Sequence, residues 1–418
     1  MKIMFLSNSA WSSSGYGMQI KEVAPRLKEM GYEVAVTAFF GLQGGRIEYD
    51  GIPHFPAGFQ PYGNDVIIPN AMEWGADIVI PLMDIWVLNP QIFQAVRMVP
   101  WCPIDHSPVP REVLMRMKSS FAALGFSQFA MQELANAGVA AQYIPHGVNT
   151  DIFHPMKPAE KKLIRAEYGL EEDAFIVGMV AANQDPSMPT RKGYERILPA
   201  ITQLRYQGGY DKLYLYIHTH PGRDMGGVPL IDIINSFDAG KFVYLPRPGT
   251  FEKGGVSREE LAKLYNAFDL YACPSRSEGF GVPILESAAC GIPSIATKFA
   301  SMSELCFSGW TIEPITDVMT PLLAFQVIPS ISSIAERIAY AYDHRDEVKE
   351  KGKQSHLAAQ DYSWDNVMET YWRPALSNIE ARLHRSHSGL SQLPQLPQPP
   401  QPPQPPQPPQ LMTPAPEE

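Results

Sequence analysis

The sequence predicts an α/β protein built from two doubly wound parallel sheets that face a central cleft. Three observations support this fold class. The 418 residues exceed what one compact core usually serves. Short apolar runs typical of buried strands alternate with segments of helical periodicity. The alternation stops at a polar segment with two prolines, residues 149–162, and then begins again.

The first half of the chain is expected to form one parallel sheet with crossover helices. Its apolar runs are almost continuous, which is typical of strands that helices cover on both faces. A loop and a helix through residues 20–31 follow the first strand. The predicted strands cover residues 2–8, 32–40, 76–83, 95–104, 121–127 and 141–148.

The second half repeats the pattern and then becomes purely helical beyond residue 330. Its predicted strands cover residues 174–183, 212–220, 241–246, 269–275 and 292–297. We therefore expect Rossmann-like domains over 1–155 and 156–335, helices over 336–385 and a Pro/Gln-rich tail over 386–418. The tail cannot build a core, and its composition predicts disorder or polyproline II. A spacer or partner-binding role and a dispensable extension both remain open for it.

Charge and composition narrow the class of protein further. The formal net charge of −10 argues against a generic nucleic-acid binder, which needs a basic face. No apolar run is long enough to span a membrane, and the first residues read as a strand, so a soluble cytoplasmic protein is expected. The four cysteines show no CxxC pairing and suggest neither a zinc site nor a disulfide framework.

The strongest local signal is the segment CPSRSEGFGVPILESAACGIPSIAT, residues 273–297. A predicted strand ends at Ser275, and the glycine-rich turn that follows leads into a helix carrying Glu286. The glycines allow close approach of a ligand, and a helix N-terminus favours a phosphate. From its place on that helix, Glu286 could accept hydrogen bonds from the hydroxyls of a bound nucleotide.

Other chemistry-bearing residues lie in loops that follow predicted strands. The loop SSGYG, residues 13–17, follows the first strand, and Asp84 and the pair Asp105–His106 follow later ones. In doubly wound sheets, ligands bind at such strand ends. A turn without a ligand is the alternative for the glycine loop and for the Asp–His pair. His218 and His220 lack a nearby carboxylate cluster, so we expect no metal there.

These segments resemble the GT-B glycosyltransferases of retaining family 4, glycosyl transferases group 1. Residues 273–297 are similar to the E-x7-E motif, in which Glu278 and Glu286 are the two glutamates. The resemblance runs through roughly residues 2–375 in the same order. Its other segments are IPHGVNTDIFHP (144–155), RKGYERILPAI (191–201), SREELAKLYNAFDLYACPS (257–275) and WDNVMETYW (364–372), the last similar to a helix that crosses back to the N-terminal domain.

The resemblance implies transfer of a sugar from a nucleotide sugar, UDP- or GDP-linked, with retention of configuration. The N-terminal domain would bind the acceptor and the C-terminal domain the donor. Lys192 would neutralise the departing diphosphate, with Arg191 as a less secure partner because Asn183 stands where relatives often carry an arginine. Glu278 would contact the donor sugar and Glu286 the ribose. The remaining donor ligands would be Gly15, Tyr16, Gly17, Gly279, Phe280 and Gly281.

On the acceptor side, the resemblance places His106 at the transferring sugar as a catalytic residue, with Asp105 and Asp84 beside the acceptor. No metal or cofactor is expected, because a helix terminus and basic residues take that place. The acceptor stays open between a glycan, a protein and another hydroxyl compound. The alternatives to a transferase are a nucleotide-sugar-binding protein and a non-transferring, epimerase-like enzyme of the same fold, with the proline tail recruiting partners.

Overall fold

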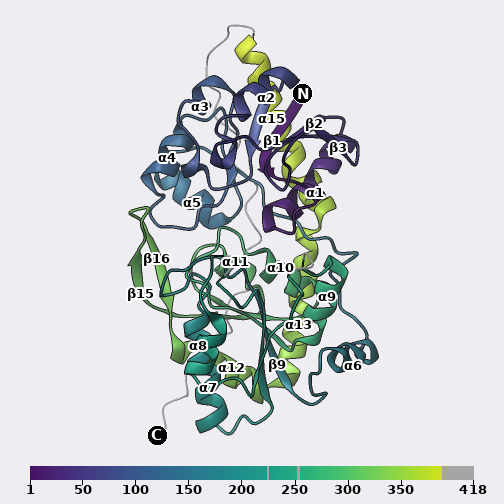
Figure 1. Cartoon of the computed structure of the whole chain (residues 1–418), viewed down its shortest axis with the longest axis vertical. Helices are drawn as coiled ribbons and strands as arrows, with labels where there is room; N and C mark the ends of the chain where they lie inside the picture. The colour runs from purple at the N-terminus through teal and green to yellow at the C-terminus, as the bar shows by residue number, and fades with distance from the viewer. Residues whose placement is uncertain (224–225, 252–254, 388–418) are drawn as a thin grey trace, which may run out of the picture.

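Two α/β domains lie end to end, one in the upper and one in the lower half of Figure 1. The computed structural model describes residues 1–223, 226–251 and 255–387. Within these residues the chain passes through the N-terminal domain, then the C-terminal domain, and returns to the first through its last helices. The expected Pro/Gln tail lies outside the described residues from position 388 on.

The N-terminal domain contains a five-stranded sheet of order β3-β4-β2-β1-β5 and a three-stranded sheet of order β6-β7-β8. An isolated parallel bridge between Val79 and Met98 joins the two. The strands are β1 (Lys2–Asn8), β2 (Glu33–Phe40), β3 (Ile47–Tyr49), β4 (Ile52–Phe55), β5 (Ile78–Pro81), β6 (Trp101–Cys102), β7 (Leu124–Gly125) and β8 (Gln142–Tyr143). The helices are α1 (Gly15–Glu29), α2 (Ile67–Trp74), α3 (Ile92–Ala95), α4 (Arg111–Lys118) and α5 (Gln128–Asn136).

Two details of this domain differ from the sequence-based expectation. The strand expected over 95–104 is reduced to β6, which is flanked by Pro100 and Pro103. Proline has no backbone N–H to donate to a ladder, so prolines confine the strand. The short antiparallel pair β3–β4 was not predicted, and it extends the sheet beyond β2 through a parallel pairing of β4.

The C-terminal domain has one six-stranded sheet of order β11-β10-β9-β12-β13-β14, parallel throughout. Its strands are β9 (Phe175–Val180), β10 (Leu213–His218), β11 (Val243–Tyr244), β12 (Leu270–Cys273), β13 (Ser294–Thr297) and β14 (Trp310–Ile312). Its helices are α6 (Pro158–Glu167), α7 (Tyr194–Gln207), α8 (Leu230–Ser236), α9 (Arg258–Ala267), α10 (Val282–Ala289) and α11 (Met302–Leu305). A separate antiparallel hairpin, β15 (Pro314–Met319) and β16 (Phe325–Pro329), follows β14.

The helices after the hairpin divide between the two domains. α12 (Ile331–Asp343) and α13 (Arg345–Ala359) stay on the C-terminal domain, where Arg337 bonds Thr311 and His356 bonds Ala289. The expected boundary between residues 335 and 336 therefore falls inside α12. The crossing back begins only with α14 (Trp364–Val367), which continues through a π-helical turn (Met368–Trp372) into α15 (Arg373–His387).

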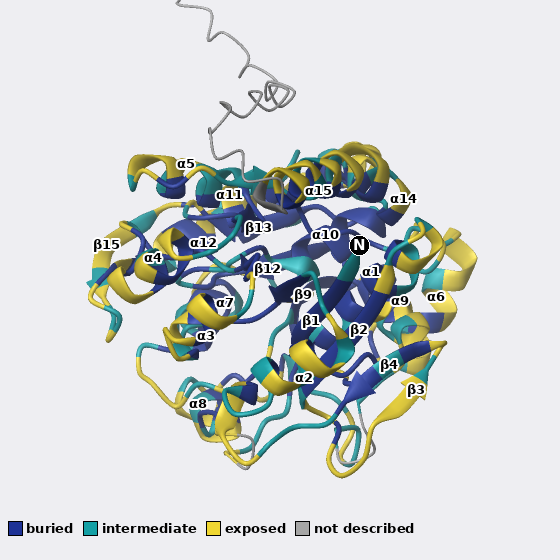
Figure 2. Ribbon diagram, turned by 90° about the horizontal axis from the view of Figure 1, so that it is seen from above, coloured by how far each residue is buried: buried dark blue, intermediate teal, exposed yellow. Residues whose placement is uncertain are grey.

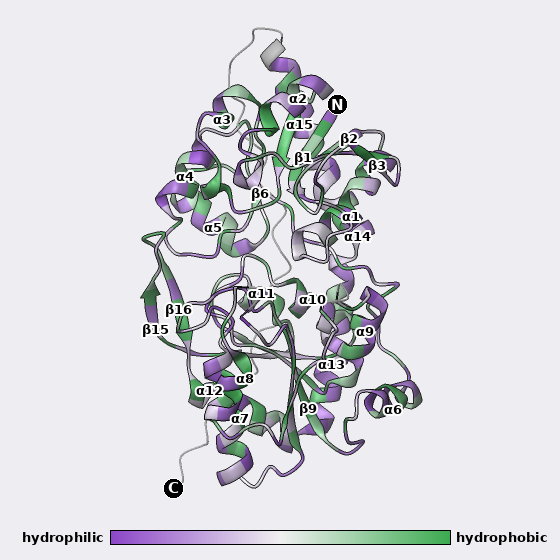
Figure 3. Cartoon of the chain, in the orientation of Figure 1, coloured by the Kyte–Doolittle hydropathy of each residue, from purple (hydrophilic) through white to green (hydrophobic). Residues whose placement is uncertain are grey.

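Tryptophans fix the crossing helices against the N-terminal domain. Trp372 meets Trp101 edge to face with ring centroids 5.0 Å apart, and both are fully buried. Figure 2 shows the central strands β1, β9 and β12 in the buried colour, while helices such as α15 turn an exposed face outward. Hydrophobic residues concentrate along β1 and β9 in Figure 3, whereas the helices carry both kinds of residue. Helix packing on both sheets thus explains the near-continuous apolar strands.

Candidate active site

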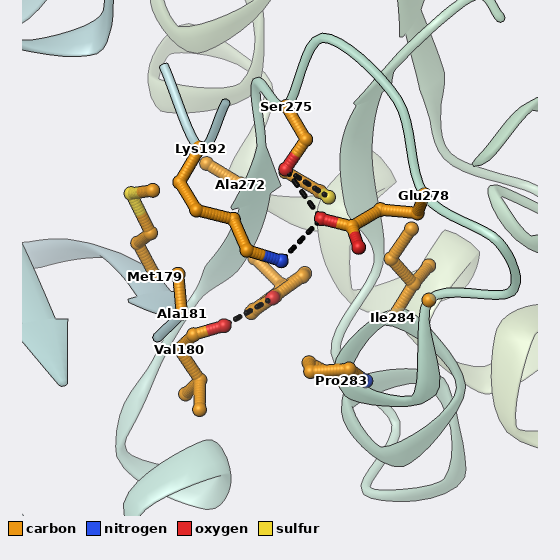
Figure 4. A pocket seen from close by; sticks show the side chains of 12 residues that line it. Met179, Val180, Ala181, Lys192, Ala272, Ser275, Glu278, Pro283 and Ile284 are labelled. Atoms are coloured by element: carbon orange, nitrogen blue, oxygen red, sulfur yellow. Dashed lines mark hydrogen bonds and ion pairs between the residues drawn. The ribbon is translucent and has the colours of Figure 1, made fainter. Parts of the chain in front are cut away.

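A small pocket lies at the point where the strand order of the C-terminal sheet reverses. Strands β10 and β11 follow β9 on one side, and β12 to β14 lie on the other. The pocket is lined by the end of β9 at Met179–Ala181, by β12 and by the loop after β12. Figure 4 shows Lys192, Ser275 and Glu278 pointing into it. Such a switch point is where doubly wound sheets bind their ligands.

An ion-pair cluster forms the polar side of this pocket. Lys192 Nζ lies 2.5 Å from Glu278 Oε1, and Arg191 lies 3.1 Å from Glu278 Oε2. Ser275 Oγ also donates to Glu278 Oε1, at 2.7 Å. Burial opposes ionisation of Glu278, but Lys192 and Arg191 outweigh it and lower the pKa of the carboxyl to about 2. Two cations and one carboxylate therefore stand at the switch point and leave one positive charge for an anionic ligand.

The glycine-rich turn leads from this cluster into helix α10. Gly281 is its N-cap with φ 102°, a left-handed conformation that favours glycine. A Cβ at Gly279 would come 2.3 Å from the Cβ of Pro103, so at this point the turn touches the N-terminal domain. Phe280 is buried, with its ring centroid 5.1 Å from that of His146. The turn is thus held from both domains, with the N-terminus of α10 directly after it.

Glu286 lies on α10 and is buried. It accepts a hydrogen bond of 3.0 Å from the hydroxyl of Tyr265. Burial raises the pKa of Glu286 to about 7, against the opposing effects of Arg258 and Tyr265. A buried carboxyl with one described partner retains capacity to accept further hydrogen bonds.

The N-terminal sheet has its own switch point, between β1 and β5. The first turn of α1 and the segment after β5 meet there, since Tyr16 Oη lies 3.5 Å from Asp84 Oδ2. Ser14 caps α1 by accepting from the N–H of Gly17, and a Cβ at Gly17 would clash with Ser9 and Ser12. Gly15 has open space around it and is exposed.

Charges from both domains converge between the two switch points. Desolvation beside the neighbouring domain raises the pKa of the Asp84 carboxyl, and Asp105 adds to the rise while Arg191 opposes it. Burial and the same Asp84 raise the pKa of Tyr16, which Arg191 again opposes. Arg191 belongs to the C-terminal domain, so it acts electrostatically on Asp84 and Tyr16 of the other domain. The predicted residues of the two domains are thus brought to one place.

Asp105 and His106 stand beside this cluster, in the loop after β6. His106 Nδ1 lies 2.7 Å from Asp105 Oδ1, and the ring is almost fully buried. Ser277, in the motif after β12, donates to the backbone oxygen of Asp105 at 2.6 Å. The loop that carries the pair therefore contacts the glycine-rich motif of the opposite domain.

Asn183 has a structural role here. It is buried, and its amide forms hydrogen bonds with the backbone of His220 and Val228, so it ties these two residues together. Gly227 lies against Asn183, and a Cβ at Gly227 would come 2.3 Å from the backbone oxygen of Asn183. Arg191, and not residue 183, pairs with Glu278 beside Lys192.

Sequence reasoning passed over Arg276, although it lies inside the segment singled out. Its backbone N–H donates to the carbonyl of Arg191, and its guanidinium lies 3.8 Å from Asp185. The Nε of Arg276 is buried without a hydrogen-bond partner among the described residues. Its position between Ser275 and Glu278 was signal enough to predict a further cation near the cleft.

The described residues contain no group of three or more His, Cys, Asp or Glu side chains arranged to hold a metal ion. His218 is buried, and burial lowers its pKa to about 4. Across the described part of the chain, no helix combines the length and apolarity needed to span a membrane.

Comparison with known proteins agrees with this architecture. The chain has the GT-B fold, in which two Rossmann-like domains face a cleft. It superposes on sucrose-phosphate synthase from Thermosynechococcus elongatus with a TM-score of 0.69 and 17% identity, covering 94% of this chain and 100% of that chain. It superposes on the HepE protein of Anabaena in complex with UDP with a TM-score of 0.66 and 16% identity, covering 90% and 100% respectively.

At the level of sequence, residues 244–311 match the family described as Glycosyl transferases group 1. The chain is 29% identical over 237 residues to a GDP-mannose-dependent alpha-(1-6)-phosphatidylinositol monomannoside mannosyltransferase of Mycobacterium tuberculosis. That match covers 52% of this chain and 56% of the relative, so the chain spans about half the length of the curated relatives it matches.

Proposed function

We propose that this protein is a retaining glycosyltransferase that moves a sugar from a UDP- or GDP-linked donor to an acceptor hydroxyl. The observation that carries the proposal is the cluster of Lys192, Arg191 and Glu278 at the switch point of the C-terminal sheet. It lies where a phosphate would also meet the N-terminus of α10. The GDP-mannose-dependent relative and the UDP complex of the structural neighbour support a nucleotide-sugar donor.

The two cations would stabilise the leaving group. When the bond between the anomeric carbon and the phosphate oxygen breaks, negative charge accumulates on the nucleoside diphosphate. Lys192 and Arg191 are held in place by Glu278, so they are preorganised for that charge. The N-terminus of α10 adds a partial positive charge. We therefore propose that the reaction needs no metal ion.

The anomeric configuration would be retained because the acceptor hydroxyl attacks the anomeric carbon from the same face that the diphosphate leaves. The acceptor oxygen forms the new bond to the anomeric carbon, and its proton passes to the departing phosphate oxygen. Glu278 would bind the donor sugar near the reacting centre, and Glu286 the ribose hydroxyls through its free acceptor capacity. Gly15, Tyr16 and Gly17 would complete the donor site from across the cleft.

The acceptor would bind from the N-terminal domain, beside Asp84, Asp105 and His106. Arg191 of the donor side interacts electrostatically with both Asp84 and Asp105. Uncharged hydroxyl compounds suit a site with two carboxylates, because each carboxylate can accept hydrogen bonds from hydroxyl groups.

The test is a panel of UDP-, GDP-, ADP- and dTDP-sugars assayed for hydrolysis and thermal stabilisation, with EDTA present. We expect one nucleotide to raise the melting temperature by mass action and its sugar to be released slowly. Proton NMR of the first-formed sugar should give the donor's own anomeric configuration. A folded protein that neither binds nor turns over any donor, or one that inverts the configuration, would contradict the proposal.

A further inference from the structure

The hairpin β15–β16 reaches out of the C-terminal domain. Its two strands form a separate two-stranded sheet, and its base is closed by a hydrogen bond from the N–H of Ser330 to the carbonyl of Glu313. In Figure 1 it runs along one side of the molecule from the level of α12 up to α4 and α5 of the N-terminal domain. It therefore bridges the two domains beside the cleft.

Backbone hydrogen bonds anchor the hairpin to both domains. Ser107 and Phe325 exchange two N–H···O bonds of 3.0 Å each, an antiparallel bridge across the cleft. Two residues further along, the N–H of Val327 donates to the carbonyl of Arg276 in the donor-side motif. β16 thus joins the loop that carries His106 to the loop that carries Glu278.

Two side chains of the same hairpin form hydrogen bonds with the Asp105–His106 pair. Thr320 Oγ1 lies 2.9 Å from His106 Nε2, while His106 Nδ1 lies 2.7 Å from Asp105 Oδ1. Gln326 Nε2 donates to the second oxygen of Asp105 at 3.3 Å. Both ring nitrogens of His106 are therefore engaged, and the ring has no free nitrogen to offer a substrate. Its effect on a substrate must pass through Asp105, whose side chain remains partly exposed, at 22%.

The hydrogen bonds form one continuous chain. An ionised Asp105 is an acceptor only, so His106 Nδ1 must donate to it. His106 Nε2, the other ring nitrogen, then lies within hydrogen-bond distance of the Thr320 hydroxyl. The same hydroxyl also lies 3.2 Å from the carbonyl oxygen of Ala324. A hydroxyl can donate to the ring or accept from it, so it fits the neutral and the protonated imidazole alike. A methyl group in its place could do neither.

We propose that the β15–β16 hairpin is an interdomain strap and that Thr320 is a positioning residue, which orients the Asp105 carboxylate toward the acceptor through His106. The inference rests on the proposed transferase function. Asp105 is then the group that meets the acceptor, and His106 holds it in place.

The experiment compares Thr320→Val, Thr320→Ser and the control Thr316→Val. Thr316 is an exposed threonine of the same hairpin, and its hydroxyl donates to the carbonyl of its neighbour Asp317, at 3.3 Å. We expect Thr320→Val to lower kcat with the best donor of the panel by about tenfold with little change in donor KM. Thr320→Ser should recover most of the loss, and Thr316→Val should match the wild type.

A second readout does not depend on turnover. The imidazole ¹⁵N signals of His106, assigned by their loss in His106→Gln, should move in Thr320→Val and stay in Thr320→Ser. If the wild type turns over no donor, the proposed function fails. The positioning role of Thr320 is then judged on the ¹⁵N signals of His106 alone. Unmoved signals in Thr320→Val would overturn the inference. So would wild-type kcat in that variant, or equal losses in the valine and serine variants.

Discussion

Glu278 is the residue on which the two cations of the donor site depend. Replacement by glutamine keeps its shape but removes the charge that Lys192 and Arg191 share. We expect Glu278→Gln to lower donor turnover by about 100-fold or more, since preorganised charge at the reacting centre is lost. Affinity for UDP or GDP should persist or rise, because the phosphate no longer competes with a carboxylate. Steady-state kinetics and calorimetric titration measure the two effects.

The matched control for that variant is Glu313→Gln. Glu313 forms an exposed ion pair of 3.1 Å with Lys298 on the same domain, and exposed pairs contribute little to stability. Its kinetics should equal those of the wild type. Full turnover in Glu278→Gln, or a parallel loss of nucleotide binding and turnover, would show that Glu278 has another role.

The raised pKa of Glu286 predicts how stability and nucleotide affinity change with pH. Its pKa is raised from 4.5 to about 7, so the folded protein retains a proton that the unfolded chain releases. Stability contributed by the protonated form is present below about pH 4.5 and is lost as pH rises to about 7. Nucleotide affinity should change in the opposite direction, because ribose hydroxyls donate best to the ionised carboxyl.

Melting temperatures and nucleotide titrations between pH 5 and pH 8 test both trends. Glu286→Gln should make the melting temperature and the nucleotide affinity less dependent on pH. Glu336 is an exposed residue of α12, and Glu336→Gln should keep the pH dependence of the wild type. A nucleotide affinity that is independent of pH in the wild type would remove Glu286 from the ribose site.

At the scale of elements, glycines at the two ends of helix α10 separate an effect on stability from an effect on nucleotide binding. Gly281 at the N-cap and Gly291 after the last turn both have positive φ, 102° and 75°. Alanine at either position should cost about 1–3 kcal/mol of stability through backbone strain. Only Gly281→Ala should also weaken nucleotide binding, because Gly281 alone lies at the end of α10 that lines the pocket. Denaturant unfolding and titration of both variants measure the difference, and equal nucleotide affinities would contradict a phosphate at this helix end.

The sequence was a good guide to the long elements and a poorer one to the short ones. β1, β9 and β10 were predicted because each is a continuous apolar run. The strands near the domain junction were predicted too long, since hydrophobicity persists through prolines that cannot join a ladder. The β15–β16 hairpin was not predicted, because its strands pair locally while its contacts, such as Thr320 to His106, lie 214 residues apart in the chain.

The same limits apply to the candidate site. Lys192, Glu278 and Glu286 lie in segments whose local pattern points to phosphate chemistry, and they could be named from the sequence. That Arg191 and not Asn183 accompanies Lys192 depends on packing that only the folded chain reveals. The engagement of both ring nitrogens of His106 depends on a hairpin from the other domain, which no local pattern could supply.

At the scale of the whole molecule, the two domains are joined by several contacts around one cleft. Glu22 of α1 pairs with Arg258 of α9, and Glu304 of the C-terminal domain accepts from the N–H of Gln128 at the start of α5. The crossing helix α15 adds a bond between Asn378 and Gln142. Between the joined domains, Lys192 and Glu278 lie at the switch point of the C-terminal sheet, and Tyr16 and Asp84 meet at that of the N-terminal sheet.

The central claim is that Lys192 and its neighbours form the donor diphosphate site. The most direct measurement is calorimetric titration of UDP, GDP and ADP, with EDTA present, into the wild type and Lys192→Met. We expect one nucleotide to bind the wild type and to lose about tenfold or more in affinity when Lys192 is replaced. Equal affinity for that nucleotide in both folded proteins, or no binding to the wild type by any of the three, would contradict the account.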